Sequence, residues 1–299
     1  MGPAYRAKQR LKNAVYFAVG AATQASLAGT VRRLVWEREP VLRILMYHKV
    51  NDLPDNPPSV PTAAFAAQMT WLRERYAPIA VDDLLAARRG ERALPRRAVL
   101  VTFDDGYRDN LEHAAPVLHR LGIPALIFLP TAFIGAARPL PHDAGLAAAN
   151  PTLGWDDARR LMDLGFEIAS HGESHRIFTS VPREEAALEI RRSKATLEER
   201  LGNPVRCFAY VNGAPDTYDD AIIAAVEGAG YALAFVTTSG PVRPDDAPWT
   251  LRRYNVEPCG PYTFARLVAG DCDLIALKDS AAGRAGKRLL NRALGTAHR

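Results

Sequence analysis

Two short segments of the chain, TFDDGY at residues 102–107 and SHGESH at residues 170–175, carry side chains that could perform chemistry together. The first contains two adjacent carboxylates, and the second contains two histidines spaced four residues apart. These side chains are Asp104, Asp105, His171 and His175. Two imidazoles and one carboxylate are a common ligand set for a divalent metal that keeps one position open for water. The remaining carboxylate would lie beside the metal, where a general base is needed.

Each segment also has a simpler interpretation. Asp-Asp-Gly after a strand is often only a turn, in which Asp caps the next helix and Gly permits an uncommon backbone conformation. Two histidines four residues apart are also frequent without any ligand. Here, however, each segment directly follows an apolar, strand-like run, AVLVTF in one case and FEIAS in the other. Catalytic side chains gather at the carboxyl ends of parallel strands, so the combination favours a metal site.

Around these segments, apolar runs typical of strands alternate with patterns typical of helices. The expected strands are 42–47, 98–103, 125–129, 166–170, 205–210, 231–236 and 251–256. The expected helices are 108–121, 155–164, 182–201 and 216–228, and the first three are each followed by a glycine. Such alternation predicts an α/β fold with a parallel sheet, closed or nearly closed. Residues 136–154, rich in alanine and proline, are expected to form a loop over the mouth of the site.

TFDDGY and SHGESH resemble the first two signature motifs of the polysaccharide deacetylase family, also called NodB-like or carbohydrate esterase family 4. The resemblance extends over roughly residues 41–275 and implies a distorted (β/α)7 barrel that removes N-acetyl groups from an amino-sugar glycan. By position, it makes Asp104 the general base and Asp105, His171 and His175 the metal ligands. Zinc suits this ligand set best, although iron, nickel or cobalt would also fit.

The segment ILMYHKV at residues 44–50 resembles the first strand of the branch that deacetylates poly-N-acetylglucosamine. In that branch a histidine of the first strand does the general-acid work, and the equivalent residue here is His48. The late Leu-x-His motif of other branches is missing, because His298 is the only histidine after residue 176. His48 is therefore expected to protonate the leaving amine. The alternative is a buried histidine whose ring is satisfied by backbone.

The third family motif, FRPPYG, is degenerate here and reads FAYVNG at residues 208–213. Alanine stands where the family has the arginine that orients the base, so that charge must come from elsewhere. Arg253 in the segment LRRYNV is the first candidate and Arg206 the second. The backbone N–H of Asn212 could still stabilise the oxyanion, and Tyr210 is a further candidate for contact with the substrate. The fourth family motif is not recognisable.

The composition fits one barrel-sized domain, since 48% of the 299 residues are hydrophobic. The charge is uneven: residues 1–43 carry a net +6 and residues 278–299 carry +5, whereas the formal net charge of the whole chain is only +5. Basic ends on an acidic body favour contact with anionic membrane lipid, although solvated tails without a partner are the alternative. No nucleic-acid motif appears. The three cysteines show no paired spacing, which argues against a disulfide framework.

The chain divides into a basic N-terminal segment at 1–40, the expected catalytic domain at 41–277 and a basic tail at 278–299. Basic residues precede an apolar stretch at 14–22, which has the outline of a signal peptide. The spacing of the apolar residues fits an amphipathic helix at a membrane face equally well, and we favour the helix. The expected location is then cytoplasmic or at the inner membrane face. It is secreted or periplasmic if residues 1–28 are cleaved.

Two classes of function follow from these residues. The first is an enzyme that hydrolyses N-acetyl groups on a polysaccharide, an oligosaccharide or a lipid-linked sugar, or that deacylates another small amide. The second is a catalytically silent glycan-binding module on the same fold, which the degenerate third and fourth motifs would suit. The metal ligands favour the enzyme, because binding a glycan does not by itself require them.

Overall fold

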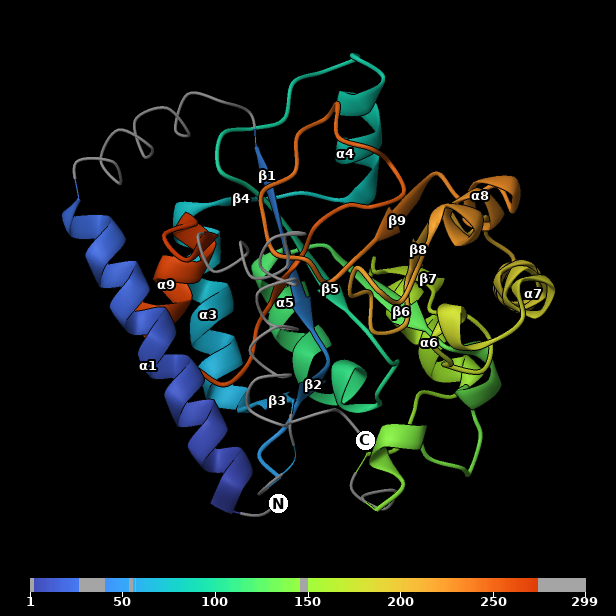
Figure 1. Ribbon diagram of the computed structural model, residues 1–299, viewed down its shortest axis with the longest axis horizontal. Coiled ribbons are helices and arrows are strands. Elements are labelled where there is room, and N and C mark those ends of the chain that lie inside the picture. The colour runs from blue at the N-terminus through green and yellow to red at the C-terminus, as the bar shows by residue number, and fades with distance from the viewer. Residues whose placement is uncertain (1–2, 27–40, 54–55, 57, 146–149, 274–299) are drawn as a thin grey trace, which may run out of the picture.

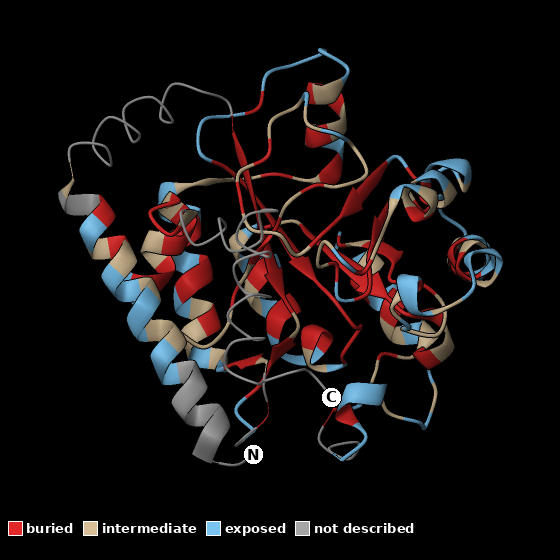
Figure 2. Ribbon diagram, viewed as in Figure 1, coloured by how far each residue is buried: buried red, intermediate tan, exposed pale blue. Residues whose placement is uncertain are grey.

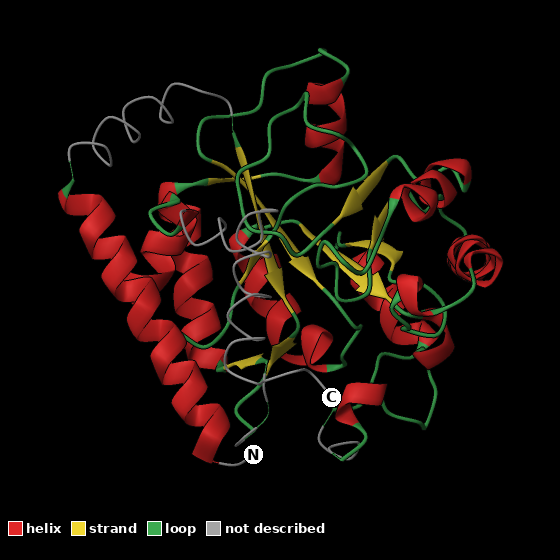
Figure 3. Cartoon of the chain, in the orientation of Figure 1, coloured by secondary structure: helices red, strands yellow, loops and turns green. Residues whose placement is uncertain are grey.

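The computed structural model describes residues 3–26, 41–53, 56, 58–145 and 150–273. Its centre is a curved sheet of parallel strands in the order β10-β1-β5-β6-β7-β8-β9, with the short β4 beside β5 (Figures 1 and 3). The strands of this sheet are β1 (Leu42–Tyr47), β4 (Ala77–Pro78), β5 (Ala98–Phe103), β6 (Ala125–Leu129), β7 (Glu167–Ser170), β8 (Cys207–Ala209), β9 (Leu233–Phe235) and β10 (Tyr254–Asn255). Two further short strands, β2 (Lys49–Val50) and β3 (Ser59–Val60), pair with each other in parallel.

The segment that contains β10 lies between the two ends of the sheet. Leu251 forms a parallel bridge with Phe235 at the end of β9. Three residues later, Tyr254 is opposite Leu45 in β1. The first and last strands are therefore neighbours, and the sheet curls into a distorted barrel. This confirms the expected α/β fold class.

Helices cover the outside of this sheet, and the strands between them are buried (Figure 2). The helices of the described residues are α1 (Pro3–Ala25), α3 (Thr62–Arg75), α4 (Val81–Arg88), α5 (Ala115–Leu121), α6 (Trp155–Asp163), α7 (Arg183–Leu201), α8 (Asp220–Gly228) and α9 (Pro261–Ala269). Local signals set several ends: α7 stops at Gly202 in the left-handed conformation, and the Asp219 side chain caps the N–H of Ile222 at the start of α8.

The expected strands 42–47, 98–103 and 125–129 have the bounds of β1, β5 and β6, whereas the later strands are shorter than expected. The helix expected at 108–121 begins instead with a π-helical turn, Asn110–Ala114. There the Asn110 side chain donates to the carbonyl oxygen of His48, which ties the turn to the end of β1. Such π-turns are frequent near functional sites because they re-aim side chains.

The N-terminal segment contains the helix α1, which lies along α9 at the edge of the molecule (Figure 1). Its side chains Leu11, Val15 and Phe17 are 67%, 45% and 52% exposed. Within the described ranges, no helix combines the length and apolar character needed to cross a membrane. The basic tail at 278–299 and the second basic cluster near residue 32 lie outside the described residues.

Candidate active site

The predicted site residues meet at the carboxyl ends of β5 and β7. Asp104 and Asp105 follow β5 directly, and His171 follows β7. The intervening strand β6 pairs with both neighbours, and the His171 N–H donates to the carbonyl of Leu129 at the end of β6. The alternation of strand and helix therefore brings two segments 67 residues apart in sequence to one edge of the sheet.

Asp105, His171 and His175 form a group whose ligand atoms all lie within 4.8 Å of one another. The Nε2 atoms of His171 and His175 lie 3.4 and 2.9 Å from Oδ1 of Asp105. Nδ1 of His171 lies 2.9 Å from the carbonyl oxygen of Ala209, and a proton donated there leaves the Nε2 lone pair directed at the group. The donor set, its spacing and this ring orientation fit a divalent metal.

The electrostatics of this group also suit a cation. Burial would raise the pKa of Asp105, but His175 and the other imidazoles hold it well below its usual value. Burial would lower the pKa of His171, but the hydrogen bond that its ring donates to Asp105 and the charge of Asp104 raise it. The buried carboxylates thus favour positive charge beside the Nε2 atoms of His171 and His175. A metal ion could supply that charge in place of a proton.

The backbone is strained at these positions. Asp105, His175 and Asn212 adopt left-handed conformations with φ of 73°, 57° and 64°, and only one other non-glycine residue of the described ranges, Arg97, does so. Such conformations are costly outside glycine and gather at functional sites, where surrounding structure maintains them. Two of these residues, Asp105 and His175, are in direct contact.

The predicted base, Asp104, is held by Arg253. Both side chains are buried, and the guanidinium donates to the two carboxylate oxygens at 2.6 and 2.8 Å. Arg253 lies immediately before β10 and also donates to the carbonyl of Val236 and to the hydroxyl of Thr102. Burial would raise the pKa of Asp104, but the Arg253 charge and nearby imidazoles lower it. The carboxylate is therefore ionised and fixed in orientation.

His48 lies at the end of β1, beside the base. The N–H of Asp104 donates to the carbonyl of Tyr47 at 2.9 Å, which aligns the ends of β1 and β5. Burial lowers the pKa of His48, and the charges of Asp105 and Asp104 oppose that effect without reversing it. Its buried Nδ1 has no hydrogen-bond partner. A ring satisfied by backbone, the alternative that the sequence left open, would have bonded that atom.

A cavity of about 300 Å³ opens beside His48. Asn212 also lines this cavity, next to the loop residues Ala214 and Pro215. Tyr210 occupies a different position, since its side chain is buried in the core and its hydroxyl donates to the carbonyl of Trp249. The Tyr210 hydroxyl is thus used within the fold, away from the cavity wall.

One residue near the metal group was not anticipated. His142 lies in the loop 136–154, and its Nε2 is 3.5 Å from Oδ2 of Asp105 and 2.8 Å from the Tyr107 hydroxyl. Its neighbour Asp143 pairs at 2.9 Å with the buried ammonium of Lys49, which fixes this part of the loop. The loop does lie over the site, as expected, but it also brings a third imidazole there. The only signal in the sequence was a histidine within that loop.

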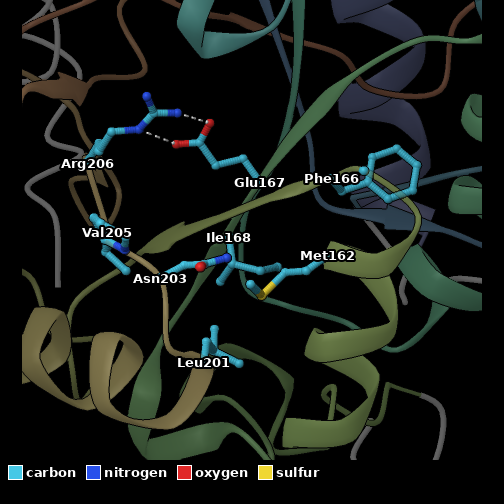
Figure 4. A pocket seen from close by; sticks show the side chains of 10 residues that line it. Met162, Phe166, Glu167, Ile168, Leu201, Asn203, Val205 and Arg206 are labelled. Carbon is cyan, nitrogen blue, oxygen red and sulfur yellow. Dashed lines mark hydrogen bonds and ion pairs between the residues drawn. The ribbon is translucent and has the colours of Figure 1, made fainter.

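Another cavity, of about 420 Å³, lies at the opposite end of the sheet (Figure 4). It is lined by the amino ends of β7 and β8 and by the ends of α6 and α7. Arg206 belongs to this cavity and pairs with Glu167 and Asp82. The second candidate for orienting the base is therefore engaged elsewhere, and Arg253 is the arginine that contacts Asp104.

Comparison with known proteins identifies a family. Residues 91–234 match the family described as polysaccharide deacetylase. The chain carries a polysaccharide deacetylase domain. The matched range contains the metal group and Asp104, but neither His48 nor Arg253. The family comprises carbohydrate deacetylases, so the expectation of a hydrolase is confirmed.

Two similar proteins match most of the chain, and a third matches a shorter part. YxkH of Bacillus subtilis, assigned to the polysaccharide deacetylases, is 26% identical over 74% of this chain and 74% of its own length. The solved structure of IcaB from Ammonifex degensii has a TM-score of 0.64 at 25% identity, covering 78% of this chain and 98% of that one. The poly-beta-1,6-N-acetyl-D-glucosamine N-deacetylase of Escherichia coli K12 is 41% identical over 69 residues, which are 23% of this chain and 10% of that protein.

Proposed function

We propose that this protein is a metal-dependent hydrolase that removes N-acetyl groups from an N-acetylglucosamine-containing glycan. The observation that carries the proposal is a buried carboxylate, Asp104, clamped by Arg253 beside a second carboxylate that contacts two imidazoles. The name of the Escherichia coli relative supports N-acetylglucosamine as the sugar. Both a polysaccharide and a lipid-linked sugar would present the same acetamido group.

Asp105, His171 and His175 would hold the metal, for which we propose zinc, with iron, nickel or cobalt as alternatives. A divalent cation bound there would polarise the acetamide carbonyl and acidify the attacking water. The chain's own groups complete the reaction. Asp104, kept ionised by Arg253, accepts the proton of the water. The backbone N–H of Asn212 stabilises the oxyanion, and His48 delivers a proton to the leaving amine.

The experiment that tests this assignment is Asp104→Asn. The amide has nearly the shape of the carboxylate but cannot accept the proton, so we expect deacetylation of N-acetylglucosamine oligosaccharides to fall at least about 100-fold. Metal content, measured on the purified protein, should persist because Asp104 is not in the ligand group. Turnover like that of the wild type would refute the assignment of the base.

A silent glycan-binding module is the competing function, and the degenerate third motif favours it. The missing arginine of that motif is the main support for a silent module. Arg253, however, makes the bidentate contact with Asp104 that orienting a base requires. The two functions are separated by measuring amine release and glycan binding on the same preparation, with and without added zinc. Binding without release under both conditions would establish the silent module.

We also propose a peripheral membrane contact through α1. The basic N-terminal segment and the exposed side chains of Val15 and Phe17 support it, since a basic amphipathic helix binds anionic lipid. Cosedimentation with anionic vesicles should exceed that with neutral vesicles, and Val15→Asp should reduce it. Equal recovery with both kinds of vesicle would exclude the contact and leave the location of the protein to other signals.

A further inference from the structure

The first half of α1 is anchored to the segment that follows β10. The ammonium of Lys12 lies 2.5 Å from a carboxylate oxygen of Glu257, and both side chains are largely shielded from solvent. The side-chain amide of the next residue, Asn13, donates to the carbonyl oxygen of Pro258 at 3.0 Å. These contacts join the N-terminal helix to the strand that closes the barrel, next to the active site.

The second half of α1 packs on α9. The rings of Phe17 and Tyr262 have centroids 4.9 Å apart. Gly20 is buried, and a Cβ placed there would lie 3.1 Å from Cβ and Cγ of Arg266. The two helices therefore approach closely where glycine leaves room. The helix is thus a packed part of the domain along most of its described length.

The inner edge of α1 reaches the cavity beside His48. Lys12 and Tyr16 line the same cavity of about 300 Å³ as His48 and Asn212. The helix therefore supplies part of the wall of this cavity. Nothing in the conserved motifs of the deacetylase resemblance involves this helix.

A polar atom of another cavity residue lacks a partner within the described residues. Asn255, in β10, lines the cavity and donates to Glu257, but its buried side-chain oxygen accepts no hydrogen bond. Buried polar atoms are rarely left unpaired without a functional reason. A sugar hydroxyl in the cavity could donate to this oxygen. The unpaired Nδ1 of His48 borders the same space.

We propose that α1 forms part of the glycan-binding site, where Tyr16, Lys12 and Asn255 bind the sugar adjoining the one that is deacetylated. This inference rests on the proposed deacetylase function and specifies its substrate contacts. An aromatic ring such as that of Tyr16 offers an apolar face to the C–H face of a pyranose. Because Glu257 balances the charge of Lys12, the wall suits a neutral N-acetylated sugar better than an anionic one.

The arrangement also bears on the fate of the N-terminal segment. Cleavage near residue 28, as a signal peptide would require, would remove Lys12 and Tyr16 from the cavity. If α1 is part of the glycan-binding site, the active protein retains it. The outer edge of the same helix, with Leu11 67% exposed, takes no part in the cavity.

The test measures glycan binding without turnover. Full-length, metal-loaded Asp104→Asn protein is titrated calorimetrically with a β-1,6-linked N-acetylglucosamine pentasaccharide. The titration is repeated with double variants that carry Tyr16→Ala or Lys12→Met in addition to Asp104→Asn. We expect each substitution to raise the Kd about tenfold, equivalent to ~1.4 kcal/mol. Leu11→Ala, a truncation on the outer edge of the same helix, is the control and should leave the Kd unchanged.

A second route avoids substituting any residue of the cavity. Gly20→Leu should push α1 away from Arg266 and weaken pentasaccharide binding by a similar factor, while the metal content stays at the level of the parent protein. Asn255→Ala, by contrast, alters the cavity itself from β10 rather than from α1, and it should also raise the Kd.

The outcomes distinguish this proposal from the function on which it rests. If the Asp104→Asn parent binds no pentasaccharide, the assignment of a glycan substrate is wrong, and so is the proposed role of α1 in binding it. If the parent binds but Tyr16→Ala, Lys12→Met and Gly20→Leu bind equally well, the deacetylase assignment stands and α1 has no role in glycan binding. Weakened binding in these variants, with the Leu11→Ala control unchanged, supports the proposal.

Discussion

Replacing Arg253 with methionine should raise the pKa of Asp104 and move the acid limb of the pH–rate profile to higher pH. The two side chains are buried and joined by two hydrogen bonds of 2.6 and 2.8 Å. Charges about 4 Å apart interact by about 4 kcal/mol at an effective dielectric constant of about 20. That energy corresponds to about three pKa units. Because imidazoles nearby still favour the carboxylate, we expect a shift of about 1–3 units.

The assay is kcat/KM for N-acetylglucosamine oligosaccharide across the acid and neutral range. The free carboxylate must be ionised to accept a proton, so activity in the variant should disappear at a higher pH than in the wild type. Arg253→Lys keeps the charge but loses the two-pronged contact, and its acid limb should fall between the other two. If the acid limbs of Arg253→Met and the wild type coincide, Arg253 does not control the ionisation of the base.

The same substitution should change the pH dependence of stability. In the wild type the folded-state pKa of Asp104 is below its unfolded value of about 3.9. The ionised carboxylate therefore contributes to the free energy of unfolding above the unfolded pKa, and this contribution is lost as pH falls through the folded-state pKa. In Arg253→Met the loss of the guanidinium raises the folded-state pKa of Asp104, so the stability that the ionised carboxylate contributes above that pKa shrinks. Breaking such a pair costs about 3–5 kcal/mol. The difference in melting temperature should therefore be large at neutral pH and smaller in acid.

Two further predictions concern the metal and the general acid. Chelation should lower the melting temperature of the wild type but not of Asp105→Ala, because a metal present at 100 times its Kd stabilises the folded protein by about 2.7 kcal/mol. Equal responses of the two proteins to the chelator in differential scanning fluorimetry would place the metal elsewhere. His48→Ala should reduce kcat about 10²- to 10⁴-fold with metal content unchanged, because general-acid catalysis is worth that much. A wild-type rate in steady-state assays of His48→Ala would remove its assigned role.

The metal group was predictable because its signals are local. Asp104 and Asp105 directly follow an apolar run that forms β5, and His171 directly follows β7. Parallel strands that are neighbours in the sheet end at one edge, so strand-end residues from different parts of the chain meet there. The bounds of β1, β5 and β6 were predictable for the same reason, since each is a short buried run ended by a change in polarity.

The place of His142 was not predictable, because it depends on contacts between distant residues. It lies in a loop without periodic pattern, and the loop is fixed by the buried pair of Asp143 with Lys49. A lysine would ordinarily be assigned to the surface, yet the side chain of Lys49, the residue after His48, is fully buried. Its ammonium lies 4.8 Å from the centre of the Tyr107 ring. Only the fold shows that this charge is paired internally.

The packing of α1 was likewise hidden by its amphipathic pattern. The apolar residues that suggested an amphipathic helix at a membrane face, including Leu11, Val15 and Phe17, are largely exposed. The face that contacts the domain instead uses Gly20 for close approach and Lys12 for an ion pair. Hydrophobic periodicity reports where apolar side chains gather, but it does not report which face a neighbouring helix covers.

The two departures from the family motifs have a common structural origin. We propose that Arg253, immediately before β10, takes the place of the arginine missing from the third motif, and that His48, immediately after β1, takes the place of the missing late histidine. β10 and β1 are paired, so both residues come from the seam where the barrel closes. Neither lies in the range that matches the family, 91–234. The seam also carries Asn255 and, through Glu257, anchors α1. Substitutions that loosen the pairing of β10 with β1 should therefore impair base, acid and glycan wall together.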